Sequence, residues 1–273
     1  MIRADAAIRR FRRDLTFSRL LRWLFAGLFI GTLLLPVLRV RLDPLMVMPV
    51  IACVFLVLSF GSVRGSRLVQ ESPSLIASGQ FEEAERRIDA ALRSFSLFRH
   101  VKVIGLHHLA LLRHAQRNWQ ESALLCRALL GQRRLGNLQG IGKPARLMLA
   151  DALLEMGDVR GASEAIAGLF EQRLSLAEVM KLLSVQLDYQ SRLGAWNDMM
   201  NGITTKVQLA ELMPAASAAR AQAMLALAAK HTGRSDWSDW LRRRAELLAD
   251  VQKLATERPV LWELWRRDVP APA

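Results

Sequence analysis

The sequence predicts an all-α protein, with an N-terminal transmembrane helical hairpin followed by an α-solenoid of about five helix pairs. Three observations support this fold class. Hydrophobic residues make up 52% of the 273 residues and aromatic residues only 7%, without the alternation of Val, Ile and Thr that is typical of strands. Two long apolar runs lie near the N-terminus. One turn pattern recurs through the remainder of the chain.

Residues 1–19 form a basic lead-in to the first apolar run. The first 22 residues contain seven arginines: Arg3, Arg9, Arg10, Arg12, Arg13, Arg19 and Arg22. The net charge of the chain is +13, and residues 1–61 contribute nine arginines against three aspartates, or +6 of that total. Because this excess lies beside the apolar runs, it favours contact with a membrane surface over contact with nucleic acid.

Two apolar runs, residues 20–38 and 44–61, each have the length of a membrane-spanning helix. At roughly 1.5 Å per residue they extend about 27 to 29 Å, close to the roughly 30 Å of a bilayer's hydrocarbon core. Arg22 would then reach back to the interface. The short connection between the runs predicts an antiparallel transmembrane hairpin over residues 20–61.

Arginines before the first run and after the second predict that the N-terminus and residues 62 onward face the cytoplasm, in a bacterial inner membrane. A cleaved signal peptide would need a small-residue cleavage site and no second apolar run. The twin-arginine export signal suggested by Arg12 and Arg13 meets the same objection. Burial in a soluble core would need a polar face on each run. Gly27 and Gly31 form a GxxxG pair, which offers a surface for oligomerisation.

Residues 62–258 are built from a turn that recurs between helical segments. Gly79 breaks one helical segment, and Phe81, Ala84 and Ile88 then fall three or four residues apart on one face of the next. Equivalent turn positions, separated by 38, 40, 37 and 39 residues, are Gly79, Arg117, Gly157, Gly194 and Gly233. This spacing predicts a repeat domain.

A glycine, an aromatic residue and then a small residue three positions later resemble the turn and second helix of the tetratricopeptide (TPR) repeat. The small position holds Ala84, Ser122, Ala162 and Ser238 in four units and Met199 in the fourth unit. The period is longer than the roughly 34 residues usual for TPR and lies near that of other two-helix repeats. The resemblance implies stacked helix pairs whose first helices line a concave groove.

The first repeat helix contains Pro73, and Pro259 ends the last one. Between them, the helix pairs are expected at 99–116 with 119–134, 143–156 with 158–173, 175–193 with 196–212, and 215–232 with 236–256. Residues 259–273 are expected to form a capping helix and a tail. Trp262 and Trp265 would cover the end of the stack or, alternatively, anchor a partner or a membrane interface.

Catalytic, cofactor-binding and metal-binding motifs are absent from the sequence, so we expect a protein that is not an enzyme and has no cofactor. The loop Gly136–Lys143 lacks the first glycine and the Ser or Thr of a phosphate loop. His107 and His114 lie about 10 Å apart along their predicted helix, too far for one zinc ion. Cys53 and Cys126 lie in separate segments and are expected to be reduced, buried thiols.

The resemblance to TPR proteins implies which charged residues line the groove and contact a partner. These are His107, His114, Asp151, Glu155, Lys181, Asp188, Arg192, Arg220 and Lys230. The basic members would bind a carboxylate or an acidic peptide segment. The alternative is that the set forms a solvated helix face.

The resulting hypothesis is a membrane-anchored TPR-like scaffold or adaptor, which contacts membrane lipids through residues 20–61 and presents a cytoplasmic groove for a protein or peptide partner. One alternative is an RNA-binding helical repeat protein, suggested by the remaining charge of +7 (29 basic and 22 acidic residues). It would need regularly placed base-reading side chains, which the sequence does not display. Another alternative is an assembly factor that holds an enzyme partner at the membrane.

Overall fold

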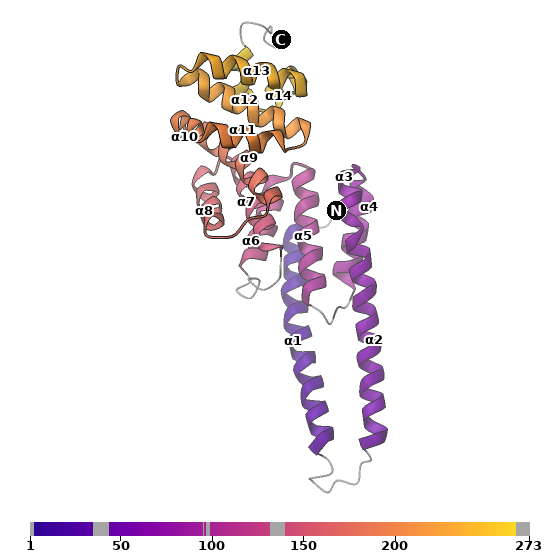
Figure 1. Cartoon of the computed structure of the whole chain (residues 1–273). Coiled ribbons are helices and arrows are strands. Elements are labelled where there is room, and N and C mark those ends of the chain that lie inside the picture. The colour runs from indigo at the N-terminus through magenta and orange to yellow at the C-terminus, as the bar shows by residue number, and fades with distance from the viewer. Residues whose placement is uncertain (1–2, 35–43, 95, 97–98, 132–139, 266–273) are drawn as a thin grey trace. The chain divides into compact units, whose positions relative to one another are not determined.

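The computed structural model describes residues 3–34, 44–94, 96, 99–131 and 140–265. Within this part of the chain every regular element is a helix, which confirms the predicted all-α class (Figure 1). The chain divides into two compact units, Met1–Ala152 and Leu153–Ala273. The predicted connection 39–43, most of the loop Gly136–Lys143 and the C-terminal tail lie outside the described residues.

Two long helices, α1 (Ala4–Leu34) and α2 (Pro44–Gln70), run side by side in the N-terminal unit and extend beyond its other helices (Figure 1). α1 continues through the expected boundary between residues 19 and 20. α2 likewise continues past residue 61. The basic lead-in is therefore one half of a helix whose other half is the first apolar run.

Shorter helices complete the N-terminal unit: α3 (Ser72–Ala77), α4 (Phe81–Arg93), α5 (Arg99–Ala115), α6 (Trp119–Leu130) and most of α7 (Gly142–Glu155). α4 is amphipathic, and its Ala84 and Ile88 are fully buried. The first half of α1 packs against α4, α5 and α6, while the second half of α2 packs against α4 and α5. Ile8 and Phe11 of α1 are buried in this core.

The C-terminal unit is built around α12 (Ala215–His231). Eleven of its residues are buried, most of them alanines. Small side chains let neighbouring helices approach closely, and α12 contacts α9, α10, α11, α13 and α15. Its neighbours are α8 (Val159–Phe170), α9 (Leu176–Arg192), α10 (Trp196–Met200), α11 (Ile203–Glu211), α13 (Ser235–Leu248), α14 (Val251–Glu257), the 3₁₀ helix η2 (Pro259–Leu261) and α15 (Trp262–Trp265).

All five predicted turn positions adopt the left-handed backbone conformation. Their φ angles are +77° at Gly79, +59° at Arg117, +79° at Gly157, +65° at Gly194 and +74° at Gly233. Each turn also repeats one pair of backbone hydrogen bonds, as in Gly79 N to Ile76 O (3.1 Å) and the following residue's N to Leu75 O (2.9 Å). This is the Schellman pattern that ends a helix. The recurrence predicted from spacing is therefore present in the backbone.

Two expected helices are interrupted. The helix expected over 196–212 breaks at Asn201 and Gly202, where Gly202 has a φ of +64° and separates α10 from α11. The helix expected over 236–256 breaks at Ala249, which is extended, and Asp250 caps the start of α14. The first break falls in the fourth unit, where Met199 occupies the expected small position and is fully buried.

The end of the C-terminal unit is covered by η2 and α15. Trp265 is 1% exposed, and its indole Nε1 donates a hydrogen bond to Glu246 Oε1 (2.8 Å). Leu261 and Leu264 are buried beside it. These three residues belong to the hydrophobic core of the C-terminal unit.

Candidate functional site

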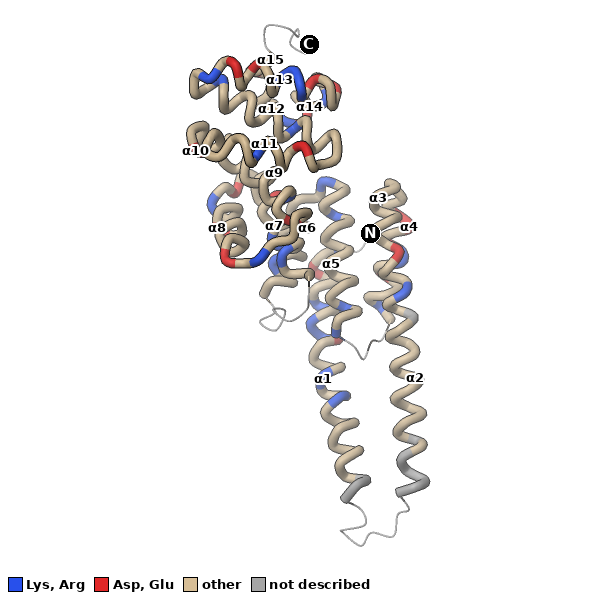
Figure 2. The backbone as a smooth tube through the Cα atoms, viewed as in Figure 1, with Lys and Arg blue, Asp and Glu red and all other residues tan. Residues whose placement is uncertain are grey.

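Large apolar side chains cover the outer surface of the second half of α1 and the middle of α2. Thirteen of them are between 42% and 74% exposed: Phe17, Leu20, Trp23, Leu24, Leu28, Phe29, Ile30, Val54, Phe55, Leu56, Val57, Phe60 and Val63. Along α1, Arg22 is the last charged residue that the structure describes. In Figure 2 the described parts of α1 and α2 farther from the other helices are tan, so they carry no Lys, Arg, Asp or Glu. Exposed apolar surfaces of this extent mark interaction sites for membranes or proteins. We call this surface the apolar hairpin.

Among the described residues, one helical stretch, Ile51–Ala77, is long and apolar enough to cross a membrane by length and composition. Its most apolar window is only 12% buried. A core helix of a soluble protein would be mostly buried. This stretch therefore has the surface exposure of a helix that contacts lipid or another protein.

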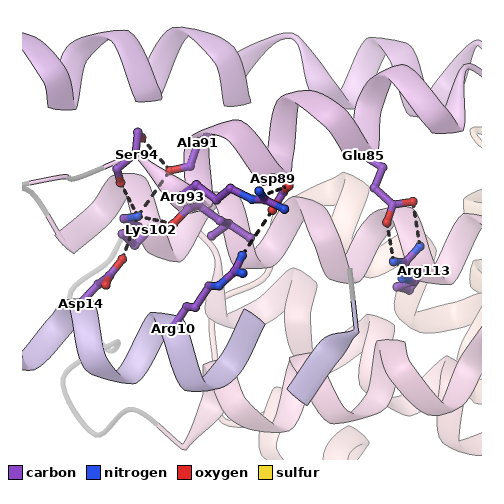
Figure 3. Close-up of polar contacts among 10 residues, drawn as sticks. Arg10, Asp14, Glu85, Asp89, Ala91, Arg93, Ser94, Lys102 and Arg113 are labelled. Carbon is purple, nitrogen blue, oxygen red and sulfur yellow. Dashed lines mark hydrogen bonds and ion pairs between the residues drawn. The ribbon is translucent and has the colours of Figure 1, made fainter. Parts of the chain in front are cut away.

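The first half of α1 is held to the N-terminal unit by a buried ammonium group. Lys102 is 2% exposed, and its Nζ lies 2.9 Å from Asp14 Oδ2. The same Nζ donates hydrogen bonds to the backbone carbonyls of Leu92 and Ser94, so the charge is surrounded by acceptors (Figure 3). A buried charge is tolerated only when it is paired in this way. Arg10 of α1 adds an ion pair with Asp89 (3.6 Å).

A second buried cation joins three helices of the same unit. Arg113 of α5 is 2% exposed and pairs with Glu85 of α4 (2.9 Å) and Glu121 of α6 (2.7 Å). It also donates to Gln116 Oε1 (2.6 Å). Figure 3 shows the paired contact with Glu85. The cluster fixes the packing of α5 between its neighbours.

Two of the predicted groove residues, His114 and Asp151, contact each other in the N-terminal unit. His114 Nε2 lies 2.9 Å from Asp151 Oδ2, and the imidazole ring meets Trp119 edge to face at 5.0 Å. His107 lies one and a half to two turns earlier on α5, beside the ring of His108 (5.9 Å). The two predicted histidines therefore do not converge on one site.

His108, which the prediction omitted, has a perturbed environment. Its Nδ1 lies 2.8 Å from Ser72 Oγ and 3.0 Å from the carbonyl oxygen of Val69. Burial lowers the pKa of His108 below its ordinary value, and the hydrogen bond to Val69 opposes that shift. The neutral imidazole therefore ties α5 to the end of α2.

The most charged cluster of the C-terminal unit surrounds Asp188 of α9. Asp188 is 3% exposed, and its carboxylate lies 3.1 Å from Arg258 Nε, 3.7 Å from Arg192 and 3.7 Å from Arg220. Arg258 also pairs with Glu155. Burial raises the pKa of Asp188, while the guanidinium groups of Arg258, Arg220 and Arg192 oppose the shift. We call these five residues the Asp188 cluster.

The remaining predicted groove residues lie apart from this cluster. Lys181 is exposed on α9. Lys230 donates a hydrogen bond from Nζ to the backbone carbonyl of Glu263 (2.6 Å), so it helps to hold α15 against α12. The structure thus brings together Asp188, Arg192 and Arg220, and it leaves Lys181 and Lys230 outside.

The arrangement has a clear consequence for ligand binding. Arg192 and Arg220, expected to bind a partner's carboxylate, already face Asp188. An incoming carboxylate would have to replace that aspartate or Glu155. The cluster therefore acts first as a tie within the unit, because two carboxylates and three guanidinium groups nearly neutralise one another.

The two cysteines differ in their surroundings. Cys126 of α6 is fully buried, as expected, and burial raises the pKa of its thiol to about 12, against the opposing effect of a hydrogen bond from Ser122. Cys53 is exposed on α2, so the prediction that it is buried within the protein is wrong. The apolar run that contains Cys53 faces outward instead of packing into a core.

Besides His108, three cations of the buried ion pairs were missed at the sequence level. Lys102 and Arg113 were not singled out, although with Leu106 and Leu109 they form one stripe of α5 at spacings of four, three and four residues. A cation on an apolar stripe is a readable signal for a buried ion pair. Arg258 offered no such signal, because it follows the last repeat helix.

No protein-family model, no curated protein and no solved structure matches this chain. Over the described residues it is an all-α protein, with one helical stretch that is apolar and long enough to cross a membrane by length and composition.

Proposed function

We propose that this chain is a membrane-anchored helical-repeat adaptor. In this proposal, the apolar hairpin lies in a bilayer, and the repeat helices present a surface to a partner protein on the cytoplasmic side. The observation that carries the proposal is the division of α1 and α2 into two halves. One half of each helix packs into the N-terminal unit, and the other half exposes the apolar hairpin.

The dimensions of the hairpin support the membrane location. The uncharged stretch of α2 from Pro44 to Gly61 has 18 residues, or about 27 Å of helix, close to the roughly 30 Å of a hydrocarbon core. Phe25 of α1 and Phe55 of α2 meet edge to face at 6.0 Å, so the two helices contact each other within this stretch. A helical hairpin satisfies its backbone hydrogen bonds internally, as a bilayer requires.

The adaptor role rests on the repeated helix pairs and on their resemblance to TPR repeats. Such repeats stack into extended binding surfaces. Within the groove set predicted from the sequence, Lys181 is the residue best suited to contact a partner, because it is exposed and the Asp188 cluster is engaged internally.

Membrane association is tested on the full chain. We expect the protein to stay in the membrane fraction after carbonate or high-salt washing and to be released by detergent. Release by salt alone would contradict the hairpin anchor. A fragment that begins at residue 62 is unsuitable, because it lacks Phe11 and Asp14, which complete the N-terminal unit.

Topology is tested with single cysteines in a C53S/C126S background. R13C, at a side chain that is 79% exposed, should react with an impermeant maleimide only from the cytoplasmic side. R39C, in the connection between the runs, should react only from the opposite side. Labelling of both positions from the same side would contradict a spanning hairpin.

Partner binding is tested by photo-crosslinking from Ala177, which is exposed one turn before Lys181 on α9, in the full-length protein in native membranes, with and without K181E. We expect one crosslinked protein whose yield falls in K181E. R192E and R220E are poor probes, since they disturb the Asp188 cluster. RNA in place of protein at this position would favour the RNA-binding alternative instead.

A further inference from the structure

A hollow lies between the two helices of the apolar hairpin. Its volume is about 400 Å³, within the range of about 300–1,000 Å³ that is typical of ligand pockets. Its lining residues are Arg22, Phe25, Ala26, Phe29, Ile51, Ala52 and Phe55. All but one are apolar, and the exception carries a full positive charge.

The position of Arg22 within the lining gives the hollow a polarity. Phe25 and Phe29 follow Arg22 by three and seven residues, so the three side chains lie along a single face of α1. Arg22 is the one nearest the packed half of the helix. The hollow is therefore positively charged at its end near the packed half of α1, and it is lined by Phe25, Phe29 and Phe55 farther along the hairpin.

Arg22 differs from the buried cations of the same unit. Lys102 and Arg113 each face carboxylates. Arg22 is exposed, its Nε donates to the backbone carbonyl of Ser18 (3.2 Å), and among the described residues no carboxylate forms an ion pair with it. Arg19, three residues earlier on the same side of α1, is also exposed and lacks an acidic partner within the described part of the chain.

We propose that this hollow binds one anionic phospholipid. The guanidinium group of Arg22, with Arg19 beside it, binds the phosphate, and an acyl chain lies against Phe25, Phe29 and Phe55. Arginine matches phosphate oxygens through paired hydrogen bonds, and a long cationic side chain at the start of a membrane span reaches the headgroup level. The proposal rests on the membrane location proposed above.

A second copy of the chain is a weaker occupant for this hollow. Helix dimers of the GxxxG type would use Gly27 and Gly31, which have no heavy atom within 4 Å of an added Cβ. Each glycine follows Phe25 or Phe29 by two residues, which is roughly 200° around the helix. The glycine face and the hollow are therefore on different sides of α1, so a dimer would leave the hollow open to lipid.

The test uses Trp23, which is 74% exposed and adjacent to Arg22. The full-length protein is reconstituted in vesicles of phosphatidylcholine and phosphatidylglycerol in which one or the other lipid is brominated. A W23F variant supplies the signal of the other tryptophans for subtraction. We expect brominated phosphatidylglycerol to quench the fluorescence of Trp23 more than its mole fraction in the bilayer predicts, because bound lipid is enriched at this site.

The variant R22Q should reduce that preference about fivefold, the effect of one basic residue at an anionic surface. R13Q is the matched control, with the same charge change on the same helix. It lies nine residues away, or about 13 Å of rise, beyond the Debye length of about 8 Å, so its preference should equal that of the wild type.

The outcomes separate the two proposals. No quenching of Trp23 by either lipid would overturn the membrane anchor itself. Quenching in proportion to bulk composition would overturn the lipid site and leave the anchor intact. Equal losses in R22Q and R13Q would overturn the lipid site in favour of general charge attraction. Crosslinking of F29C to a second chain, undiminished by phosphatidylglycerol, would assign the hollow to a dimer and also overturn it.

Discussion

The two units bury charge in opposite senses. In the N-terminal unit the buried groups are cations, Lys102 and Arg113, and the carboxylates that face them come from neighbouring helices and are partly exposed. In the C-terminal unit the buried group is the anion Asp188, and arginines surround it. In each unit an ion pair joins two segments that are far apart in the sequence. Asp14 of α1 pairs with Lys102 of α5, and Arg258, which follows α14, pairs with Asp188 of α9.

The two units also differ in their exposed apolar surface. Only the N-terminal unit, within the described residues, combines a buried ion pair with helices that continue into a long exposed apolar stretch. The pair between Asp14 and Lys102 therefore lies where the packed half of α1 gives way to the apolar hairpin. In the C-terminal unit, the Asp188 cluster instead joins α9 to α12 and to the segment that follows α14.

The largest effect is expected for D188A. Removing the carboxylate leaves guanidinium groups of Arg192, Arg220 and Arg258 without their shared acceptor, and breaking a buried pair costs about 3–5 kcal/mol. Hydrogen exchange of α9 and α12 amides should accelerate accordingly. E164A is the control, because Glu164 is 72% exposed and surface pairs contribute only about 0–1 kcal/mol. Equal effects of the two variants would contradict a buried tie.

The next effect tests the apolar hairpin through L28D. A carboxylate at the centre of a membrane helix costs about 2.5–3.5 kcal/mol on insertion scales, so the fraction of protein that resists carbonate washing should fall strongly. L247D is the control, since Leu247 is 86% exposed on α13 of the other unit. A similar loss in both variants would indicate misfolding and not a loss of insertion.

D14A probes the tie on α1. Without this carboxylate, Lys102 keeps only backbone carbonyls around its buried ammonium group, and the expected loss is about 1–3 kcal/mol. Faster hydrogen exchange in the first half of α1 would report the loosened helix. R13A, which changes the adjacent exposed residue, should stay within about 0.5 kcal/mol of the wild type. Unchanged protection in D14A would mean that Phe11 and Ile8 suffice to hold α1.

A pH dependence is expected from His108 in the N-terminal unit. Burial lowers its pKa from the ordinary value of 6.5, so the unfolded chain binds the proton more readily than the folded chain. The stabilising contribution is full above pH 6.5 and is lost as the pH falls towards the folded pKa, with a slope of at most about 1.4 kcal/mol per pH unit. Unfolding midpoints of H108N should lose this slope, while H100N, at an exposed position, should retain it.

The smallest effects compare the turns of the two units. Arg117 adopts a φ of +59°, where Gly157 has +79°. A side chain in this conformation costs about 1–2 kcal/mol, and glycine's greater freedom in the unfolded chain offsets part of the gain. R117G should therefore stabilise by less than about 1 kcal/mol, whereas G157A should destabilise by about 1 kcal/mol. Thermal unfolding of both variants measures the difference, and a loss of stability in R117G would show that the contacts of Arg117 outweigh the strain.

Local patterns predicted the all-α class, the turn positions and most helix limits. Turn positions such as Gly157 and helix limits such as those of α5 and α9 follow from hydrophobic spacing and backbone preference, which depend on neighbouring residues. The breaks after Met200 and Leu248 were missed, because Gly202 and Asp250 were read as interior positions of longer helices.

The charged contacts were harder to predict. Asp14 and Lys102 are 88 residues apart (102 − 14) in the sequence, and spacing alone cannot select such a partner. The groove set was derived by analogy, which found Asp188, Arg192 and Arg220 but not the segment that supplies Arg258. Whether these residues face a partner or one another depends on tertiary packing, which the sequence pattern does not contain.

Arg258 and Trp265 lie close to the end of the chain, yet both are built into the interior of the C-terminal unit. During translation both residues leave the ribosome after helices α1 to α14. Until then, the carboxylates of Asp188 and Glu155 lack one guanidinium partner, and the alanine-rich α12 lacks its final cover. The C-terminal unit therefore cannot complete its core until Trp265 has been made, and a chain that stops before Arg258 would lack both contacts.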